Sequence, residues 1–122
     1  MTETPAARSF DLEDRTFEFA RRCRSFAKGL PVAVGNQEDG RQLIRASGSV
    51  GANYIEANEA ASKKDFVYRA RVSRKEAKEV RYWLRLLDCG QAAAINAERD
   101  ALVQESTELL RILSAIIEKS SR

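Results

Sequence analysis

Residues 65–87, DFVYRARVSRKEAKEVRYWLRLL, carry the pattern that decides the fold. Apolar and small residues recur there at alternating intervals of four and three positions, the spacing that brings side chains to one face of an α-helix. Ser62 followed by Asp65 resembles a capping box at the start of this helix, and Gly90 follows its end. We therefore predict a helix over residues 63–88 whose buried face consists of Phe66, Ala70, Ser73, Ala77, Val80, Leu84 and Leu87.

Three further segments show helical periodicity. They cover residues 11–28, 37–60 and 97–119, and Asp11, Asn36 and Asn96 are the predicted N-caps. Helices of this length joined by short connections pack as antiparallel neighbours. The sequence thus predicts an all-α protein, an up-down-up-down four-helix bundle forming a single domain over residues 1–122. Residues 1–9 are expected to be flexible.

Residues 43–60, LIRASGSVGANYIEANEA, contain two glycines inside a predicted helix. Each interior glycine costs about 1 kcal/mol relative to alanine. At 100° per residue, Ser47 and Gly51 share the core side, whereas Gly48 and Ala52 lie nearly opposite. Small residues let helices approach closely, so this pattern predicts a helix between two others, one of them from a second subunit. In the alternative interpretation, Gly48 and Ala52 are simply tolerated at the surface.

A second apolar flank lies on the 63–88 helix, away from its buried face. Exposed apolar and aromatic residues of this kind often mark protein contacts. Arg45 and Glu56 on the 37–60 helix can form ion pairs across such a contact. We therefore predict a homo-oligomer whose interface includes Arg45, Gly48, Ala52, Glu56, Tyr68, Val72, Trp83 and Leu86. In the alternative, Trp83 lies at a boundary and is half covered by its own loops.

Basic residues are concentrated on the 63–88 helix. Between positions 62 and 85 there are nine Lys or Arg and three Asp or Glu, although the net charge of the whole chain is only +3. One side of this helix carries a basic stripe, predicted to contact phosphates of RNA or DNA: Arg71, Arg74, Lys75, Lys78, Arg81 and Arg85. Glu76 and Glu79 interleave with it, so a solvated or ion-paired face is the alternative. The two corresponding functions are a nucleic-acid-binding accessory protein and a protein-interaction scaffold.

Most enzyme and cofactor classes find no support in the sequence. The chain has no histidine, which removes the commonest general base and the Glu-x-x-His motif of di-iron bundles. Cys23 and Cys89 have no metal-binding spacing, and the glycines match no phosphate-binding motif. We predict no catalytic residues, cofactor or metal. The absence of a long apolar run or a signal-like segment predicts a cytoplasmic protein that does not enter membranes.

Three stretches together resemble the 23S rRNA intervening-sequence proteins, a family of small bacterial four-helix bundles. They are RSFDLEDRTFEFARRCRSF (8–26), QLIRASGSVGANYIEANEA (42–60) and SKKDFVYRARVSRKEAKEVRYWLRLL (62–87). The most specific positions are 44–49, 51–53 and 56–57, followed by 75–77, 79 and 82–84. The family is named after the location of its genes, and the biochemical role of its members is not settled. The bundle is similar to the accessory variability protein of diversity-generating retroelements, a homopentamer that binds nucleic acid and a reverse transcriptase. The resemblance therefore implies a homopentamer and leaves any protein partner open.

Overall fold

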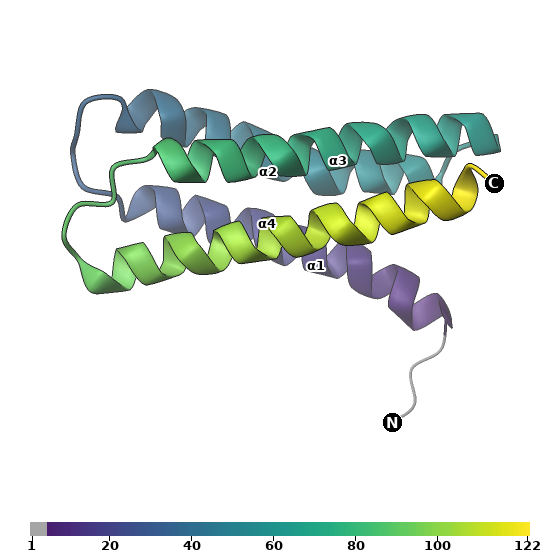
Figure 1. Cartoon of the computed structure of the whole chain (residues 1–122), viewed down its shortest axis with the longest axis horizontal. Coiled ribbons are helices and arrows are strands. Elements are labelled where there is room, and N and C mark those ends of the chain that lie inside the picture. Colours follow the sequence, from purple (N-terminus) through teal and green to yellow (C-terminus); the bar gives the residue numbers. More distant parts are fainter. Residues whose placement is uncertain (1–4) are drawn as a thin grey trace.

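The computed structural model describes the backbone of residues 5–122 and the side chains of residues 12–122. Its four helices are α1 (Pro5–Lys28), α2 (Asn36–Asn58), α3 (Lys63–Leu86) and α4 (Ala93–Ser120). The connections α1–α2 and α3–α4 lie at one end, and the α2–α3 turn lies with the C-terminus at the other (Figure 1). This arrangement confirms the predicted all-α, up-down-up-down four-helix bundle.

The first helix begins earlier than predicted. It starts at Pro5 instead of residue 11, because proline has no N–H to leave unpaired and its fixed φ suits a first helical position. Asp11 is therefore inside the helix and is not its N-cap. Residues 5–9 of the segment predicted to be flexible are helical, and residues 1–4 lie outside the described residues.

The helix caps agree with the sequence only in part. Ser62 caps α3 as predicted, since its hydroxyl accepts a hydrogen bond from the backbone N–H of Asp65 at 3.1 Å. Asn96 is not the cap of α4, which begins at Ala93. Its amide nitrogen instead donates to the carbonyl oxygens of Gly90 and Ala92, at 3.1 and 3.0 Å. Helices α2 and α3 each end two residues earlier than predicted.

Asn36 joins two connections instead of capping α2. The N-cap position is taken by Gly35, whose φ of +91° favours glycine. The buried Asn36 amide nitrogen donates to the carbonyl oxygens of Pro31 and Asp88, at 3.0 and 2.9 Å. Its amide oxygen accepts from the backbone N–H of Asp88 at 3.0 Å. These three bonds tie the α1–α2 and α3–α4 connections together.

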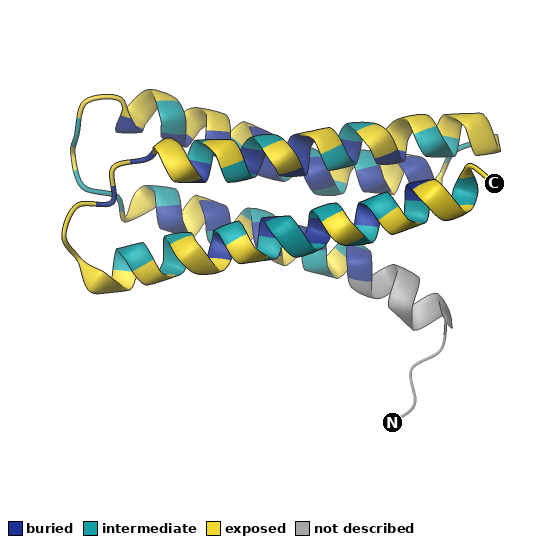
Figure 2. Ribbon diagram, in the orientation of Figure 1, coloured by how far each residue is buried: buried dark blue, intermediate teal, exposed yellow. Residues whose placement is uncertain are grey.

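The core runs along the inner sides of the four helices (Figure 2). Six of the seven positions predicted for the α3 core face are buried, and Phe66 is half-buried. Helix α2 packs most extensively against α3. The Ser73 hydroxyl donates to the carbonyl oxygen of Val50 across this contact, at 2.7 Å. Small residues therefore allow the α2 and α3 backbones to lie close together.

Gly51 has the corresponding role between α2 and α1. A Cβ atom at this position would lie 2.9 Å from the Thr16 hydroxyl oxygen, closer than real Cβ contacts allow. The prediction that Ser47 and Gly51 face inward is thus confirmed: Ser47 is fully buried, and Gly51 lies against α1. None of the described helices is both long and apolar enough to cross a membrane.

Candidate nucleic-acid interface

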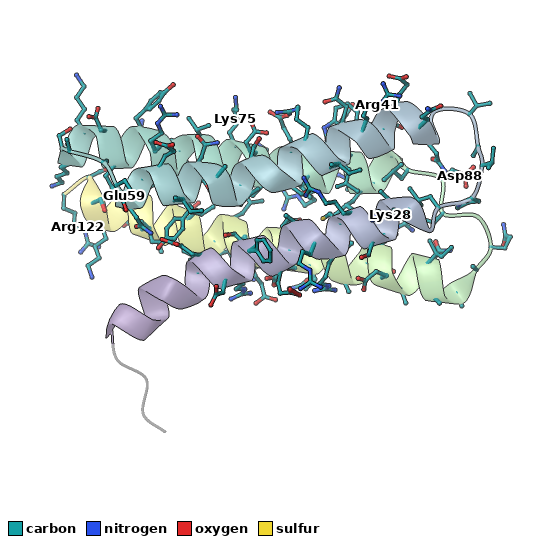
Figure 3. All side chains as sticks on the ribbon, turned by 180° about the vertical axis from the view of Figure 1, so that it is seen from behind. Lys28, Arg41, Glu59, Lys75, Asp88 and Arg122 are labelled. Carbon is teal, nitrogen blue, oxygen red and sulfur yellow. The ribbon has the colours of Figure 1, made fainter. Side chains whose placement is uncertain are left out.

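The basic stripe lies along the groove between α3 and α4. This groove, hereafter the α3–α4 groove, has a volume of about 440 Å³. Its lining comprises Leu110 of α4 and five of the six predicted residues: Arg71, Arg74, Lys75, Lys78 and Arg81. Arg85 is exposed one turn further along α3. Lys75 points from α3 into solvent (Figure 3).

Two guanidinium groups of the stripe are positioned by hydroxyl groups of α4. Arg74 Nη1 donates to Ser114 Oγ at 3.4 Å, and Arg81 Nη1 donates to Thr107 Oγ1 at 3.3 Å. Each neutral hydroxyl orients a guanidinium without cancelling its charge. The remaining donors of both arginines stay available for an anion.

The two glutamates that interleave with the stripe in sequence point away from it. Arg45 Nη2, on α2, donates to Glu76 Oε1 at 3.3 Å and to Glu79 Oε1 at 3.1 Å. The Glu76 carboxylate is buried, and its only contact with the stripe is Lys75 Nζ at 4.0 Å. The five other cations of the stripe have no carboxylate within 4.0 Å among the side chains of residues 12–122.

Two glutamates in the first half of α4 pair with arginines of α1 and do not line the α3–α4 groove. Arg15 of α1 donates to Glu105 at 2.7 and 2.8 Å, and Arg22 donates to Glu98 at 3.1 Å. The hydrogen bond with Glu105 raises the pKa of the Arg15 guanidinium. Because these carboxylates form ion pairs with arginines of α1, the side of α4 that faces the stripe carries less negative charge than the sequence of α4 suggests.

Arg111 of α4 extends the basic surface and was missed by sequence reasoning. It is exposed and lines a neighbouring hollow of about 590 Å³ together with Arg81. One carboxylate, Glu118, lies at the end of this hollow, 3.9 Å from Arg122 Nη2. Helical periodicity predicts on which face of its own helix a residue lies. It does not predict which residue of a second helix will lie opposite. No signal in the sequence therefore connects Arg111 with the stripe.

Gly48 and Ala52 line a second groove, between α1 and α2. This α1–α2 groove has a volume of about 360 Å³ and includes the exposed apolar side chains of Phe17 and Ile55. A Cβ atom added at Gly48 would lie 3.3 Å from Arg24 Nη2. Phe17 and Ile55 were not predicted, although both are apolar residues outside the buried face of their helices. Glu56 is exposed on α2, and Arg45 already forms ion pairs with α3 of the same chain.

The other predicted interface residues lie on α3 and do not line this groove. Tyr68 and Leu86 are 60% and 50% exposed, and Val72 is half-buried. Trp83 is half-buried because it packs against the core of its own chain. Its indole Nε1 is buried and has no hydrogen-bond acceptor among the described residues. The structure thus places the predicted interface residues in two separate regions.

Neither cysteine has the character of a nucleophile. Burial raises the pKa of the Cys23 thiol to about 12, and burial also raises the pKa of Cys89. Both thiols are therefore protonated near neutral pH, whereas the thiolate is the reactive form. Among the described residues, no cluster of histidine, cysteine or acidic side chains could hold a metal ion.

Comparison with known proteins places the chain in a family. The family model described as 23S rRNA-intervening sequence protein matches residues 8–115. The chain is also similar to a protein with unknown function from the S23 ribosomal protein family of Bacteroides thetaiotaomicron, whose crystal structure is known. The two are 31% identical with a TM-score of 0.75, and the match covers 90% of this chain and 97% of the other. No match is found among curated proteins. The family match spans most of the sequence, including Gly48 and Gly51 of α2 and the whole basic stripe, and this chain belongs to the 23S rRNA-intervening sequence protein family.

Proposed function

We propose that this protein is a non-enzymatic, self-associating helical bundle that binds nucleic acid along the α3–α4 groove. The observation that carries the proposal is the distribution of charge around α3. Five cations of the stripe have no carboxylate partner among the described side chains, while Glu76 and Glu79 face Arg45 on the other side of the helix. A row of cations without partners fits a polyanion such as a phosphate backbone.

The expected binding is dominated by phosphates and is not specific for sequence. Lysine and arginine contacts to phosphates position a nucleic acid but carry no direct sequence information. Six phosphate contacts would give a log–log salt slope near −5 on duplex DNA and near −4 on a single strand. The name of the family refers to intervening sequences of 23S rRNA, so structured RNA is the first ligand to test.

A salt series tests this function directly. We would measure binding of the protein to structured RNA and to duplex DNA between about 50 and 300 mM salt, the range in which phosphate contacts change affinity steeply. The triple variant Arg74→Ala/Lys78→Ala/Arg81→Ala should weaken binding and reduce the log–log salt slope by the amount expected for the loss of about three phosphate contacts. A matched control, Lys28→Ala/Arg41→Ala/Lys119→Ala, removes the same charge from exposed positions that do not line the α3–α4 groove.

The control separates a local site from the effect of net charge. Lys28 and Arg41 lie on α1 and α2 (Figure 3). If both triple variants lose affinity equally, the stripe is not a site. If the wild-type protein binds neither nucleic acid at about 50 mM salt, where phosphate-dominated binding is strong, the proposal is wrong.

Self-association is the second part of the proposal. The apolar α1–α2 groove and the exposed flank of α3 both support it, and the homopentamer implied by the resemblance is our choice of assembly. Several copies would present several basic stripes to one nucleic acid, which strengthens binding through effective concentration. The cytoplasmic location and the similarity to the accessory variability protein remain predictions.

Native mass spectrometry tests the assembly. Ala52→Arg introduces a long charged side chain at an exposed position of the α1–α2 groove and should dissociate the oligomer. Val34→Arg, at a fully exposed position of the α1–α2 connection, is the control. Trp83→Ala tests the α3 flank, with circular dichroism to confirm folding because Trp83 packs against the core. A wild-type monomer at micromolar concentration would overturn the assembly.

A protein-interaction scaffold is the second candidate function. The exposed Phe17 and Ile55 side chains in the α1–α2 groove favour it, because apolar surface of this kind marks protein contacts. On this interpretation the basic stripe serves only solubility. An oligomer that binds no RNA or DNA in the salt series would support the scaffold.

A further inference from the structure

We propose that the α3–α4 groove binds a single-stranded segment of nucleic acid and that Tyr82 stacks on one of its bases. The inference rests on the proposed function and adds the class of ligand. Tyr82 is not among the site residues predicted from the sequence. It is 57% exposed, although it lies on the helix that carries the basic stripe.

Cations of the stripe lie on one side of Tyr82. In a helix, residues three and four positions apart are neighbours on the surface, so Lys78 and Arg85 flank the tyrosine on one side along α3 and Glu79 and Leu86 on the other. Arg81 is adjacent in sequence and lines the groove. A strand whose phosphates contact Lys78, Arg81 and Arg85 therefore passes beside the Tyr82 ring.

The Tyr82 ring contacts the Trp83 indole and is more than half exposed. Its centroid lies 5.2 Å from that of the Trp83 indole, with an interplanar angle of 79°, an edge-to-face contact with a side chain packed on the core. Among the described residues, no cation stacks on Tyr82. Tyr68, which is similarly exposed, differs because the Arg69 guanidinium lies over its ring, 5.5 Å from the centroid.

An exposed aromatic ring beside a row of cations favours a single strand over a duplex. Bases of a duplex are stacked on one another, so their faces are not accessible to a side chain on the protein surface. Unpaired bases expose their faces and stack on aromatic residues while the phosphates follow a basic groove. From Arg71 to Arg85 the stripe extends about 21 Å along α3, enough to contact several consecutive phosphates of one strand.

Two substitutions at the same position separate stacking from simple bulk. Tyr82→Phe keeps the ring, and Tyr82→Leu keeps apolar volume and helix propensity but removes the ring. The ligands are a labelled single-stranded RNA and a hairpin duplex of matched composition, measured by fluorescence anisotropy. We expect Tyr82→Leu to weaken single-strand binding by roughly 5- to 150-fold, the range for loss of one base–aromatic stack. Tyr82→Phe should stay close to wild type, and duplex affinity should change little in both variants.

The salt dependence gives a second readout. Tyr82 carries no charge, so Tyr82→Leu should lower single-strand affinity at every salt concentration and leave the log–log slope unchanged. The triple variant of Arg74, Lys78 and Arg81 should instead reduce the slope. Trp83 is the only tryptophan of the chain, and its contact with Tyr82 makes its fluorescence an independent probe. In the wild-type protein, the fluorescence should change on adding a single strand but not a duplex.

The outcomes distinguish this inference from the proposed function. Unchanged single-strand affinity in Tyr82→Leu, with steep salt dependence in the wild type, overturns base stacking and leaves phosphate binding in place. Equal losses for single strand and duplex also overturn it. If the wild-type protein binds neither ligand at about 50 mM salt, the inference and the nucleic-acid function both fail. Should Tyr82→Leu not fold, Tyr82→Gln and the fluorescence of the wild-type protein decide the question.

Discussion

The glycines of α2 allow a quantitative prediction about how closely its neighbours approach. Alanine at an interior helix position is more favourable than glycine by about 1 kcal/mol. Apart from its chain neighbours and the nearby backbone of its own helix, Gly40 has no atom within 4 Å of the position that a Cβ would occupy, so Gly40→Ala should stabilise the protein by nearly this amount. At Gly51 the same Cβ would lie 2.9 Å from Thr16 Oγ1 and 3.3 Å from Thr16 Cβ.

Thr16 cannot move away easily. Its side chain is fully buried, and its hydroxyl donates to the carbonyl oxygen of Glu13 at 2.9 Å. Because it is β-branched, its χ1 angle is restricted in a helix. Gly51→Ala must therefore shift α1 or break this hydrogen bond, and overpacking of this kind costs about 1–3 kcal/mol. After subtracting the gain in helix propensity, we expect Gly51→Ala to lower the free energy of unfolding by about 0–2 kcal/mol.

The difference in free energy of unfolding between these two variants tests the argument more precisely than either value alone. Gly40→Ala and Gly51→Ala share the propensity gain, so their difference of about 1–3 kcal/mol reports the contact with Thr16. Gly48→Ala should behave like Gly40→Ala, because its Cβ would approach only the end of the flexible Arg24 side chain, at 3.3 Å from Nη2. Each kcal/mol corresponds to a change in Tm of about 4 °C for a domain of this size.

Urea unfolding followed by circular dichroism at 222 nm measures these differences. All variants must be compared at one protein concentration, because self-association stabilises the folded state. The double variant Thr16→Ala/Gly51→Ala should be less destabilised than the sum of its two single variants, since the clashing oxygen is gone. If Gly51→Ala proves as stable as Gly40→Ala, the argument that Gly51 sets the α1–α2 distance is refuted.

Three further predictions concern buried polar groups. Asn36→Ala should lower the free energy of unfolding by about 2–4 kcal/mol in urea titrations, because it removes three hydrogen bonds, two of which reach the α3–α4 connection. Asn96→Ala, the control near the surface, should cost under about 1 kcal/mol. Arg45→Ala should lower the free energy of unfolding by about 1–3 kcal/mol, because the buried Glu76 carboxylate loses its guanidinium partner. Adding Glu76→Gln to this variant should restore part of the lost stability, and no recovery would contradict this account. Cys23, whose pKa is raised by burial from 9.0 to about 12, should contribute a loss of stability with rising pH. Below pH 9.0 the Cys23 thiol is protonated in both the folded and the unfolded state, whereas between pH 9.0 and about 12 only the unfolded state releases the proton. The free energy of unfolding should therefore fall by up to about 1.4 kcal/mol per pH unit in this range. The fall should be steeper than in the control variant Cys23→Ala.

The four helices and most of their buried faces follow from local patterns in the sequence. Val80 and Leu84 are in the core because their spacing matches the helical repeat, and this repeat is a local property of the backbone. The cap at Ser62 was readable for the same reason, since it involves residues three positions apart. The start of α1 was not, because both Pro5 and Asp11 are suitable beginnings and the sequence does not rank them.

The contacts between residues of different helices depend on how the helices pack and could not be predicted from local patterns. Periodicity places Glu76 and Glu79 on a flank of α3, but the position of α2 turns them towards Arg45 and leaves the stripe without those carboxylates. The same holds for Arg111, which lies beside the stripe only because of the register of α4 against α3. Asn36 has the features of a cap, yet its side chain bonds instead to Pro31 in its own connection and to Asp88 in the adjacent one. The spacing of residues in a chain fixes the faces of each helix, whereas the partner of each face depends on the distance and register between helices.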